Sequence, residues 1–339
     1  MEKPVIRISV RNLVEFILRN GDLESGGTAG DKEAMLKGSR LHRKIQKQMG
    51  SHYQAEVSLK KDTEYEDLIL RVEGRADGIF TQNEKICIDE IKGVYKNLEL
   101  LAEPVLVHRA QALCYAWIYL DDHGLEEIDV QMTYAHLDTE MIKRFRETMT
   151  REELESWYQR LLDSYHKWLS YQMKWREERN RSMEKLEFPF IYRKGQKEMV
   201  AGIYHAISRK EQIFIQAPTG VGKTMSAVFP AVRSIGEGKA ETLFYLTART
   251  ITRTVAQDAF EILRKNGLLF KTVTITAKEK LCFCEKPECN PETCPYAKGH
   301  YDRINDAVYE LWTNEQSFDR ETILRQAEKW QGCPFEMSL

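Results

Sequence analysis

The sequence contains no apolar run that could cross a membrane. A spanning helix needs about 20 consecutive apolar residues, and no stretch of the 339-residue chain approaches that length. The first residues, MEKPVIRIS, also lack the apolar segment of a secretory signal. We therefore expect a cytoplasmic protein without a membrane partner.

Net charge is nearly absent as well. Fifty Lys and Arg residues stand against 52 Asp and Glu residues, so any contact with nucleic acid must come from local basic patches. Cysteine is scarce, and five of the seven cysteines lie in the last sixty residues. An odd number crowded into one segment argues against a secreted disulfide framework and favours a metal or cluster site.

What the chain does have is length for two domains and clear helix and strand patterns. In the first half, helical spacing covers 10–19, 32–49 and 108–124, and strand patterns cover 53–62 and 128–137. Two further extended runs, 66–80 and 84–94, are separated by the polar turn TQN and predict a β-hairpin. We expect a first domain over 1–149 and a long helical connector over 150–187, which contains no Pro or Gly.

The second half alternates helix and strand. A helix over 195–207 precedes the strand QIFIQAP, a glycine loop, the helix TMSAVFPAVRSI and the strand TLFYLT. This order predicts a parallel sheet. The cysteine-rich segment, 276–339, interrupts it, and the patterns INDAVYELW and DRETILRQAEKW predict helices of an inserted subdomain.

The segment QAPTGVGKT, 216–224, follows an apolar strand and opens a helix, which is the context of a phosphate loop. Gly220 and Gly222 let backbone N–H groups turn toward the phosphates, Lys223 reaches the terminal phosphates, and Thr224 can ligate magnesium. The pattern therefore predicts ATP and Mg²⁺ at a loop completed by Ala217, Pro218, Thr219 and Val221, with Ala217 at the usual place of the first glycine.

With its surroundings this loop resembles superfamily 2 helicases of the DinG and XPD type. Arg193 and Gln196 stand where such helicases grip the adenine base, and TART, 247–250, stands where they touch a single strand. The resemblance implies the first part of a RecA-like domain over 188–275. The acidic strand that an ATPase needs for magnesium and water does not follow. We therefore expect the motor to continue beyond residue 339 and the chain as given to hydrolyse ATP poorly.

The cysteine spacing matches neither zinc ribbons nor bacterial ferredoxins, and spacing alone favours zinc. DinG- and XPD-type helicases insert a four-cysteine iron–sulfur domain at the corresponding place in the motor. That resemblance implies a mainly helical insertion with a [4Fe-4S] cluster held by Cys282, Cys289, Cys294 and Cys333. Cys284 is then the extra thiol; the choice between Cys282 and Cys284 stays open, and zinc is the alternative metal.

The hairpin of the first domain gathers charged residues. Asp77 lies on its first strand, and Glu90 and Lys92 lie two apart on the second, so that both point to one face of the sheet. Folding about the TQN turn brings Asp77 within a residue or two of Glu90. Two carboxylates beside a lysine can hold a divalent cation against a phosphodiester. Asp89 points to the opposite face and is expected to be structural.

The ordered set G-x-x-x-H, G-R-x-D-G, D-E-x-K and Q-x-x-x-Y resembles the RecB-type branch of PD-(D/E)XK nucleases. The resemblance implies an α/β domain with a mixed sheet flanked by helices. It also implies Mg²⁺ or Mn²⁺ ligated by His42, Asp77 and Glu90, a catalytic Lys92, and Gln111 with Tyr115 positioning DNA. Cys87 and Cys114 alternate with core residues, which predicts buried side chains and a domain that folds without a cluster.

These resemblances together indicate the N-terminal portion of a bacterial nuclease–helicase acting on single-stranded or forked DNA, with other DNA-repair proteins as candidate partners. One alternative is a helicase whose nuclease fold is inactive and only guides DNA. Another is a non-enzymatic, redox-responsive DNA-binding module. The sequence specifies neither DNA over RNA nor the oligomeric state.

Overall fold

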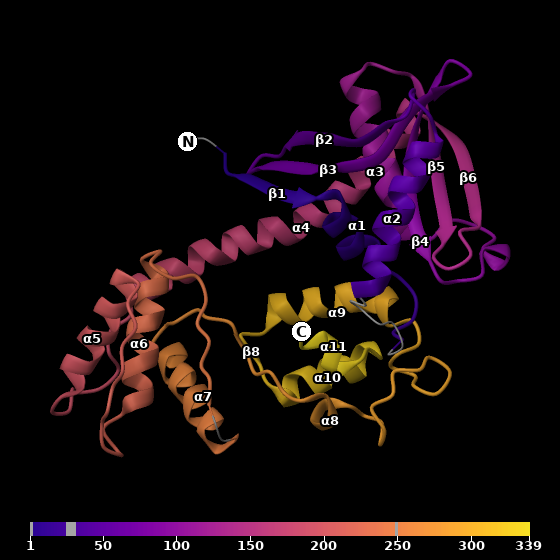
Figure 1. Ribbon diagram of the computed structural model, residues 1–339. Coiled ribbons are helices and arrows are strands. Elements are labelled where there is room, and N and C mark those ends of the chain that lie inside the picture. The colour runs from indigo at the N-terminus through magenta and orange to yellow at the C-terminus, as the bar shows by residue number, and fades with distance from the viewer. Residues whose placement is uncertain (1–2, 25–31, 248–249) are drawn as a thin grey trace. The chain divides into compact units, whose positions relative to one another are not determined.

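The computed structural model describes residues 3–24, 32–247 and 250–339, with side chains left out at 32–34 and 250–253. The chain divides into two units (Figure 1). Unit 1 comprises Met1–Trp168, Cys282–Val308 and Ala327–Met337, and unit 2 comprises Leu169–Leu281, Tyr309–Gln326 and Ser338–Leu339. The five cysteines of the cysteine segment therefore belong to unit 1 with the first half of the chain, whereas 309–326 of that segment and the phosphate loop belong to unit 2.

The first half of the chain builds a six-stranded sheet and its helices (Figure 1). In chain order the elements are β1 (Val5–Ser9), α1 (Val10–Leu18), α2 (Lys32–Gln48), β2 (Gln54–Glu64), β3 (Ile69–Gln82), β4 (Lys85–Val94), the 3₁₀ turn η1 (Leu98–Leu100), α3 (Leu106–Asp122), β5 (Glu127–His136), β6 (Ile142–Thr150) and α4 (Arg151–Glu184).

The sheet is mixed, with the order β1-β3-β4-β5-β6 and β2 on β3. Strand β3 is antiparallel to both β2 and β4. Strand β5 is parallel to β4, and β6 is antiparallel to β5. Because β4 and β5 are parallel, the chain must cross over between them, and α3 makes that crossover. β1 is parallel to β3 at Ile69–Glu73, whereas β4 pairs further along β3.

The predicted hairpin is confirmed. Gln82 pairs with Lys85, which leaves Asn83 and Glu84 as a two-residue turn. Both have left-handed φ angles, 52° and 62°, as a type I′ turn requires. The turn lies at the end of the TQN pattern, and it sets the register that places Asp77 opposite Glu90.

Helices cover both faces of the sheet. On one face, Leu41 and Ile45 of α2 share an apolar cluster with Ile91 of β4. On the other face, Gln111 of α3 contacts Lys92, the next residue along β4. Successive residues of a strand point to opposite faces, so α2 and α3 lie on opposite sides of β4. The predicted helices α1, α2, α3 and α4 and the strands β2 and β5 are confirmed, whereas β1 and β6 were not anticipated.

Unit 2 is built from helices around an apolar cluster. The elements of unit 2 and of the cysteine segment are, together and in chain order, α5 (Gln196–Arg209), α6 (Lys223–Gly236), α7 (Thr250–Lys265), β7 (Thr272–Val273), α8 (Lys278–Leu281), α9 (His300–Asn314), β8 (Ser317–Phe318), α10 (Arg320–Trp330) and α11 (Pro334–Met337). Val228 and Val232 of α6 pack with Phe260 and Leu263 of α7 and with Met183 at the end of α4.

Two predicted strands of this unit are not formed. QIFIQAP and TLFYLT have no ladder partner among the described residues, and they expose Phe214 and Leu246 almost fully, at 93% and 87%. A fully apolar run forms a buried parallel strand only when neighbouring strands satisfy its N–H and C=O groups. The strand prediction was therefore wrong for these segments as they stand, although the helices α5 and α6 beside them are confirmed.

The cysteine segment of unit 1 is tied to the chain that follows α1. Leu23 donates its N–H to Ala297 O at 2.8 Å, and Tyr301 donates its N–H to Gly21 O at 2.9 Å. Asp22 accepts from the N–H of Gly299 at 2.6 Å. Leu23 also shares one apolar cluster with three of the cysteines. Within unit 1 the cysteine segment is therefore part of the same folded body as the sheet.

His108 gives unit 1 a predictable response to acid. Burial, with the positive charges of Lys92, Arg11 and Lys96, lowers the pKa of His108 from 6.5 to about 4. The unfolded chain therefore binds a proton between pH 6.5 and 4 that the folded chain does not, so stability falls as the pH falls through this window. We expect a loss of about 3 kcal/mol by pH 4.

Denaturant unfolding of the wild type and a His108→Phe variant between pH 7 and 4 measures this loss. The variant should lack the His108 part of the pH dependence. Exposed His123→Asn is the matched control and should retain it. Parallel pH profiles for the wild type and His108→Phe would contradict the assignment.

Candidate functional site

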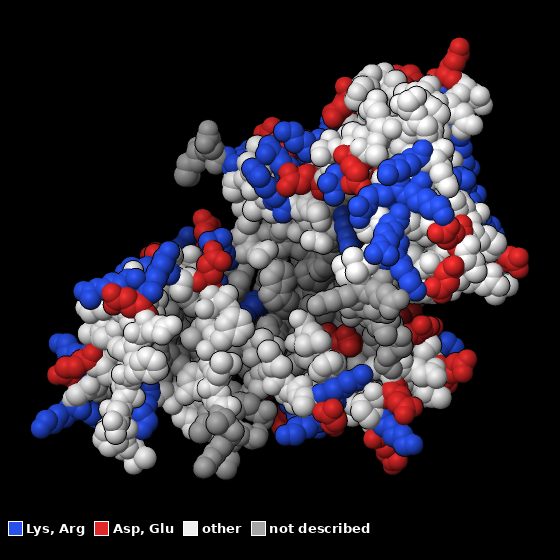
Figure 2. All heavy atoms as spheres, viewed as in Figure 1, with Lys and Arg blue, Asp and Glu red and all other residues white. Residues whose placement is uncertain are grey.

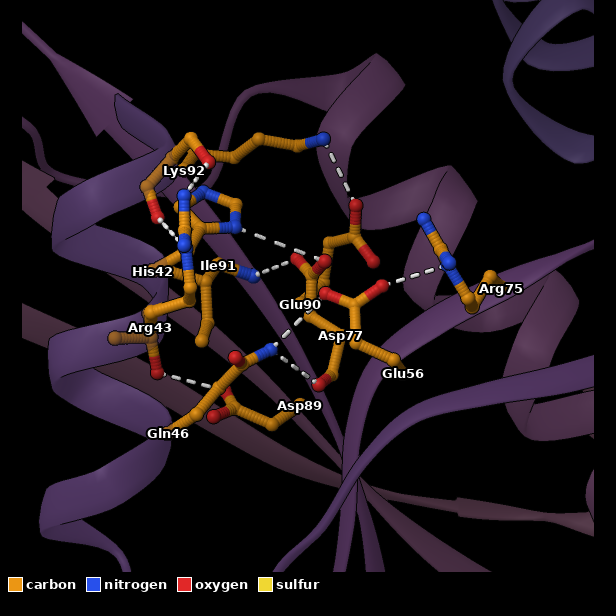
Figure 3. A network of polar contacts seen from close by, with 12 residues as sticks. His42, Arg43, Gln46, Glu56, Arg75, Asp77, Asp89, Glu90, Ile91 and Lys92 are labelled. Atoms are coloured by element: carbon orange, nitrogen blue, oxygen red, sulfur yellow. Dashed lines mark hydrogen bonds and ion pairs between the residues drawn. The ribbon is translucent and has the colours of Figure 1, made fainter. Parts of the chain in front are cut away.

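Asp77 lies at the point where β3 and β4 separate. The ladder between them ends at the pair Gly78 and Asp89, so the next residues, Asp77 and Glu90, stand opposite each other without pairing. Asp77 Oδ2 instead accepts the N–H of Ile91 at 2.7 Å, and its Oδ1 lies 3.7 Å from His42 Nδ1. Figure 3 shows His42 of α2 facing this carboxylate, while Gln46 of α2 donates to the backbone carbonyl of Asp77 at 3.0 Å.

Glu90 is the most deeply buried charged group of this cluster. Its Oε1 lies 2.8 Å from Lys92 Nζ, while its Oε2 is buried without a partner among the described residues. Burial raises the pKa of Glu90 to about 8, with the charge of Asp77 adding and that of Lys92 opposing. Burial likewise raises the pKa of Asp77, opposed by His42. Two carboxyl groups with raised pKa values and one orphaned oxygen are arranged for a cationic ligand.

Gln111 and Tyr115 reach the same cluster from α3. Gln111 Oε1 accepts from Lys92 Nζ at 2.7 Å. The Tyr115 ring packs against Gly74, where a Cβ would lie 2.7 Å from its hydroxyl. On the other face Tyr53 packs against Gly78, where a Cβ would lie 1.8 Å from its ring. The glycines of GRADG therefore admit an aromatic ring on each side of the strand that carries Asp77.

Sequence reasoning missed Glu56 of β2. Its neighbours pair with Gly78 and Ala76, which places Glu56 opposite Asp77. Its φ is +58°, a left-handed value that is strained for a glutamate. Arg75 Nε lies 2.6 Å from its Oε2 and Gln46 Nε2 donates to its Oε1 at 3.2 Å (Figure 3). No sequence signal marks a left-handed glutamate inside a strand.

Asp89 is structural, as expected. It is fully buried and accepts from Thr133 Oγ1 at 2.6 Å, Tyr53 Oη at 3.0 Å and Gln131 Nε2 at 3.2 Å. Cys87 and Cys114 are also fully buried, and burial raises the pKa of Cys87 to about 12. Across the described part of the chain, no three His, Cys, Asp or Glu side chains stand close enough to form a ready-made metal site. Cation binding beside Asp77 would therefore require small side-chain movements.

The phosphate loop of unit 2 lines a cavity of about 560 Å³, within the usual range for small-molecule sites. Seven of the ten residues predicted to bind the nucleotide line it: Arg193, Gln196, Thr219, Gly220, Gly222, Lys223 and Thr224. Gly220 and Gly222 have φ of 80° and 78°, and α6 begins at Lys223. The predicted loop-to-helix geometry for phosphate binding is therefore present.

Local contacts hold the loop in place. Lys223 Nζ donates to the carbonyls of Ala217 and Pro218 at 2.9 and 3.0 Å. Arg193 donates to the carbonyl of Gly220. Of the TART segment, Ala248 and Arg249 lie outside the described residues, so the predicted strand contact is not tested here.

Four of the described cysteines belong to one apolar cluster with Leu23, but their thiols do not form a ready-made metal site. Cys289, Cys294 and Cys333 are buried in one apolar cluster, and Cys284 packs against it. Cys284 Sγ lies 3.7 Å from Cys294 Sγ, and burial raises the pKa of Cys284 to about 11. His300 Nδ1 accepts the N–H of Cys333 at 3.2 Å. The cluster thus includes Cys284, which the sequence left as the extra thiol, as well as three of the four predicted ligands.

Comparison with known proteins finds a likeness over part of the chain. Residues 193–289 match the family described as DEAD/DEAH box helicase. The match supports a superfamily 2 helicase that uses ATP with Mg²⁺ on nucleic acid. A solved structure titled "Crystal structure of SSO0001" aligns with 19% identity over 46% of this chain and 75% of that chain, at a TM-score of 0.32. No curated protein matches. Among the described helices, none combines the length and apolarity needed to cross a membrane.

Proposed function

We propose that this chain joins a metal-dependent nuclease of the RecB type, in unit 1, to a helicase motor of the DinG and XPD type. The observation that supports the nuclease most strongly is convergence. Although the residues come from α2, β3, β4 and α3, His42 lies beside Asp77, and Lys92 contacts both Glu90 and Gln111. The charges of Asp77 and Glu90 act on each other and on Tyr115. Nothing in the packing of the sheet alone requires two buried carboxylates there.

The donor set fits a hard divalent cation. Asp77 and Glu90 offer carboxylate oxygens, including the orphaned Oε2 of Glu90, and His42 offers a ring nitrogen. A bound Mg²⁺ or Mn²⁺ supplies polarisation of the phosphodiester and a more acidic water. Lys92, oriented by Glu90 and Gln111, is placed to stabilise negative charge on the phosphate.

Cleavage of a labelled single strand tests this proposal. The wild type should cut it with Mg²⁺ or Mn²⁺ but not with chelator, and Lys92→Met should reduce the rate by at least about 100-fold. Exposed Lys96→Met is the matched control. Full binding of the strand with no cleavage under either metal would favour the alternative of an inactive fold that guides DNA.

A thiolate-bound metal centre in the cysteine segment is supported by the shared apolar cluster, although the thiols would have to move to form it. Cys284, Cys289, Cys294 and Cys333 gather at one place, and their deprotonation on metal binding would release protons. We propose a [4Fe-4S] cluster by the resemblance to DinG and XPD helicases. Zinc is the second candidate, because two thiolates on one tetrahedral zinc lie about 3.8 Å apart, close to the 3.7 Å between Cys284 and Cys294.

Metal analysis of anaerobically prepared protein separates the two candidates. A cluster gives about four irons per chain and a broad brown absorbance, whereas one zinc and no iron would contradict it. Comparing Cys284→Ser with Cys282→Ser identifies the fourth ligand. We expect the larger loss of metal for Cys284→Ser because Cys284 packs on the apolar cluster.

A further inference from the structure

From Met35 onward, the exposed side of α2 carries positive charge only. Between Met35 and Gln48 the helix has five Lys or Arg residues and no Asp or Glu, although the whole chain is almost neutral. Arg40, Arg43, Lys44 and Lys47 are all exposed. Their spacing of i, i+3, i+4 and i+7 places them on one face of a helix. Figure 2 shows Lys and Arg side chains gathered where Figure 1 places α2.

This basic face borders the proposed nuclease centre. His42 and Gln46 lie on the same helix, next to the face that carries Arg43. His42 lies beside the carboxylate of Asp77, and Gln46 donates to the backbone carbonyl of Asp77. Figure 3 shows Arg43 beside His42. The Arg43 guanidinium is held by Ser39 through its carbonyl and hydroxyl oxygens, at 3.3 and 3.1 Å, and neither oxygen carries a full negative charge.

The internal pairing on α2 leaves three cations available. Lys44 forms an ion pair with Glu140 and Lys37 with Asp138. Within the described part of the chain, Arg40, Arg43 and Lys47 have no carboxylate partner. They span seven residues, or roughly 10 Å along the helix. That length matches about three nucleotides of a strand at 3.4 Å each.

We infer that Arg40, Arg43 and Lys47 form a basic surface, here called the track. It binds the phosphate backbone of a single nucleic-acid strand beside Asp77 and Glu90. The inference rests on the proposed function for its purpose and for the choice of a single strand, but the surface itself is defined by its charge. The partner is a single strand because a helicase motor delivers unpaired strands. Phosphate contacts carry no base information, so the track binds strands of any sequence.

Salt dependence of binding tests the inference in the full chain without divalent metal, so that nothing is cut. Each phosphate contact on a single strand contributes about 0.7 to the slope of log Kobs against log salt concentration. The Arg40→Gln/Arg43→Gln/Lys47→Gln variant should therefore lose about 2 units of slope and about 100-fold in affinity at 0.1 M salt. Glutamine is a good helix former, and an unchanged Tm would show that the fold is intact.

The probes are 30-nucleotide oligo-dT and oligo-rU, and both should show the loss because the phosphates are shared. Arg40→Gln/Lys47→Gln should lose about 1.4 units. The matched control, Arg7→Gln/Lys60→Gln, removes two exposed cations of β1 and β2, and its slope should not change. An unchanged slope for the triple variant, or an equal loss in the control, would overturn the inference.

Failure of the two proposals is distinguishable. If the wild type never cleaves but the triple variant loses slope, the nuclease proposal fails and the track stands as a strand-binding surface. If the wild type cleaves and the slope is unchanged, only the track fails.

Discussion

A Glu90→Gln variant will be more stable than the wild type at pH 8 and above in the absence of metal, and it will have lost strand cleavage by about 1,000-fold or more. The wild type holds a buried carboxyl group whose Oε2 has no partner among the described residues. An unsatisfied buried polar group costs about 1–3 kcal/mol, and more when it is charged. The neutral amide removes that charge and with it the proposed cation ligand.

The pH dependence carries a definite sign. Because the folded pKa of Glu90 is raised from 4.5 to about 8, the folded chain binds a proton in this window that the unfolded chain has released. The free energy of unfolding therefore falls as the pH rises from 4.5 to 8. The contribution of Glu90 is fully retained only below pH 4.5. The Glu90→Gln variant lacks this contribution, so the difference between the two proteins should grow across the window by several kcal/mol.

Thermal unfolding with and without 10 mM MgCl₂ measures the cation effect without any activity assay. If the Kd of the cation for the folded state is 10 to 100 times lower than the cation concentration, binding raises the free energy of unfolding by about 1.4–2.7 kcal/mol. This corresponds to several degrees in Tm. We expect that shift for the wild type at pH 8 and not for Glu90→Gln. Equal shifts for both proteins would place the cation elsewhere.

Lys223→Ala will weaken nucleotide binding in unit 2. Lys223 is the cation of the phosphate loop, and it is held at the loop by the carbonyls of Ala217 and Pro218. A hydrogen bond to a charged group contributes about 1.5–3 kcal/mol, so ATP affinity should fall roughly 10- to 100-fold.

Fluorescent-nucleotide binding measures the loss, with exposed Lys265→Ala of α7 as the control. Metal-dependent cleavage without ATP should be unchanged in Lys223→Ala, and ATP binding should be unchanged in Glu90→Gln. Undiminished nucleotide affinity in Lys223→Ala would remove the phosphate-loop assignment.

Local chemistry explains why much of the proposed nuclease cluster could be anticipated. A hairpin register is set by its turn, so the TQN pattern was enough to place Asp77 within a residue or two of Glu90, and the turn at Asn83 and Glu84 makes them directly opposite. Helical spacing likewise placed Gln111 and Tyr115 on one face of α3. Glu56 could not be found this way, because its backbone is left-handed and its partners Arg75 and Gln46 come from other elements.

The parts that sequence reasoning missed depend on distant partners. QIFIQAP and TLFYLT have strand patterns, but a strand exists only when another strand pairs with it. β6 was missed because IKRFRETMT has no regular apolar alternation, and pairing with β5 makes it a strand. The inclusion of Cys284 in the apolar cluster depends on side-chain packing that spacing cannot specify.

The attachment of the cysteine segment to the chain after α1 also affects synthesis. Asp22 and its partner Gly299 are 277 residues apart. A ribosome adding about 5–20 residues per second needs roughly 15 to 55 seconds to bridge that gap. During this interval the nascent chain exposes Leu23 and its neighbours, so the emerging N-terminal segment is a natural target for chaperones until the thiols arrive.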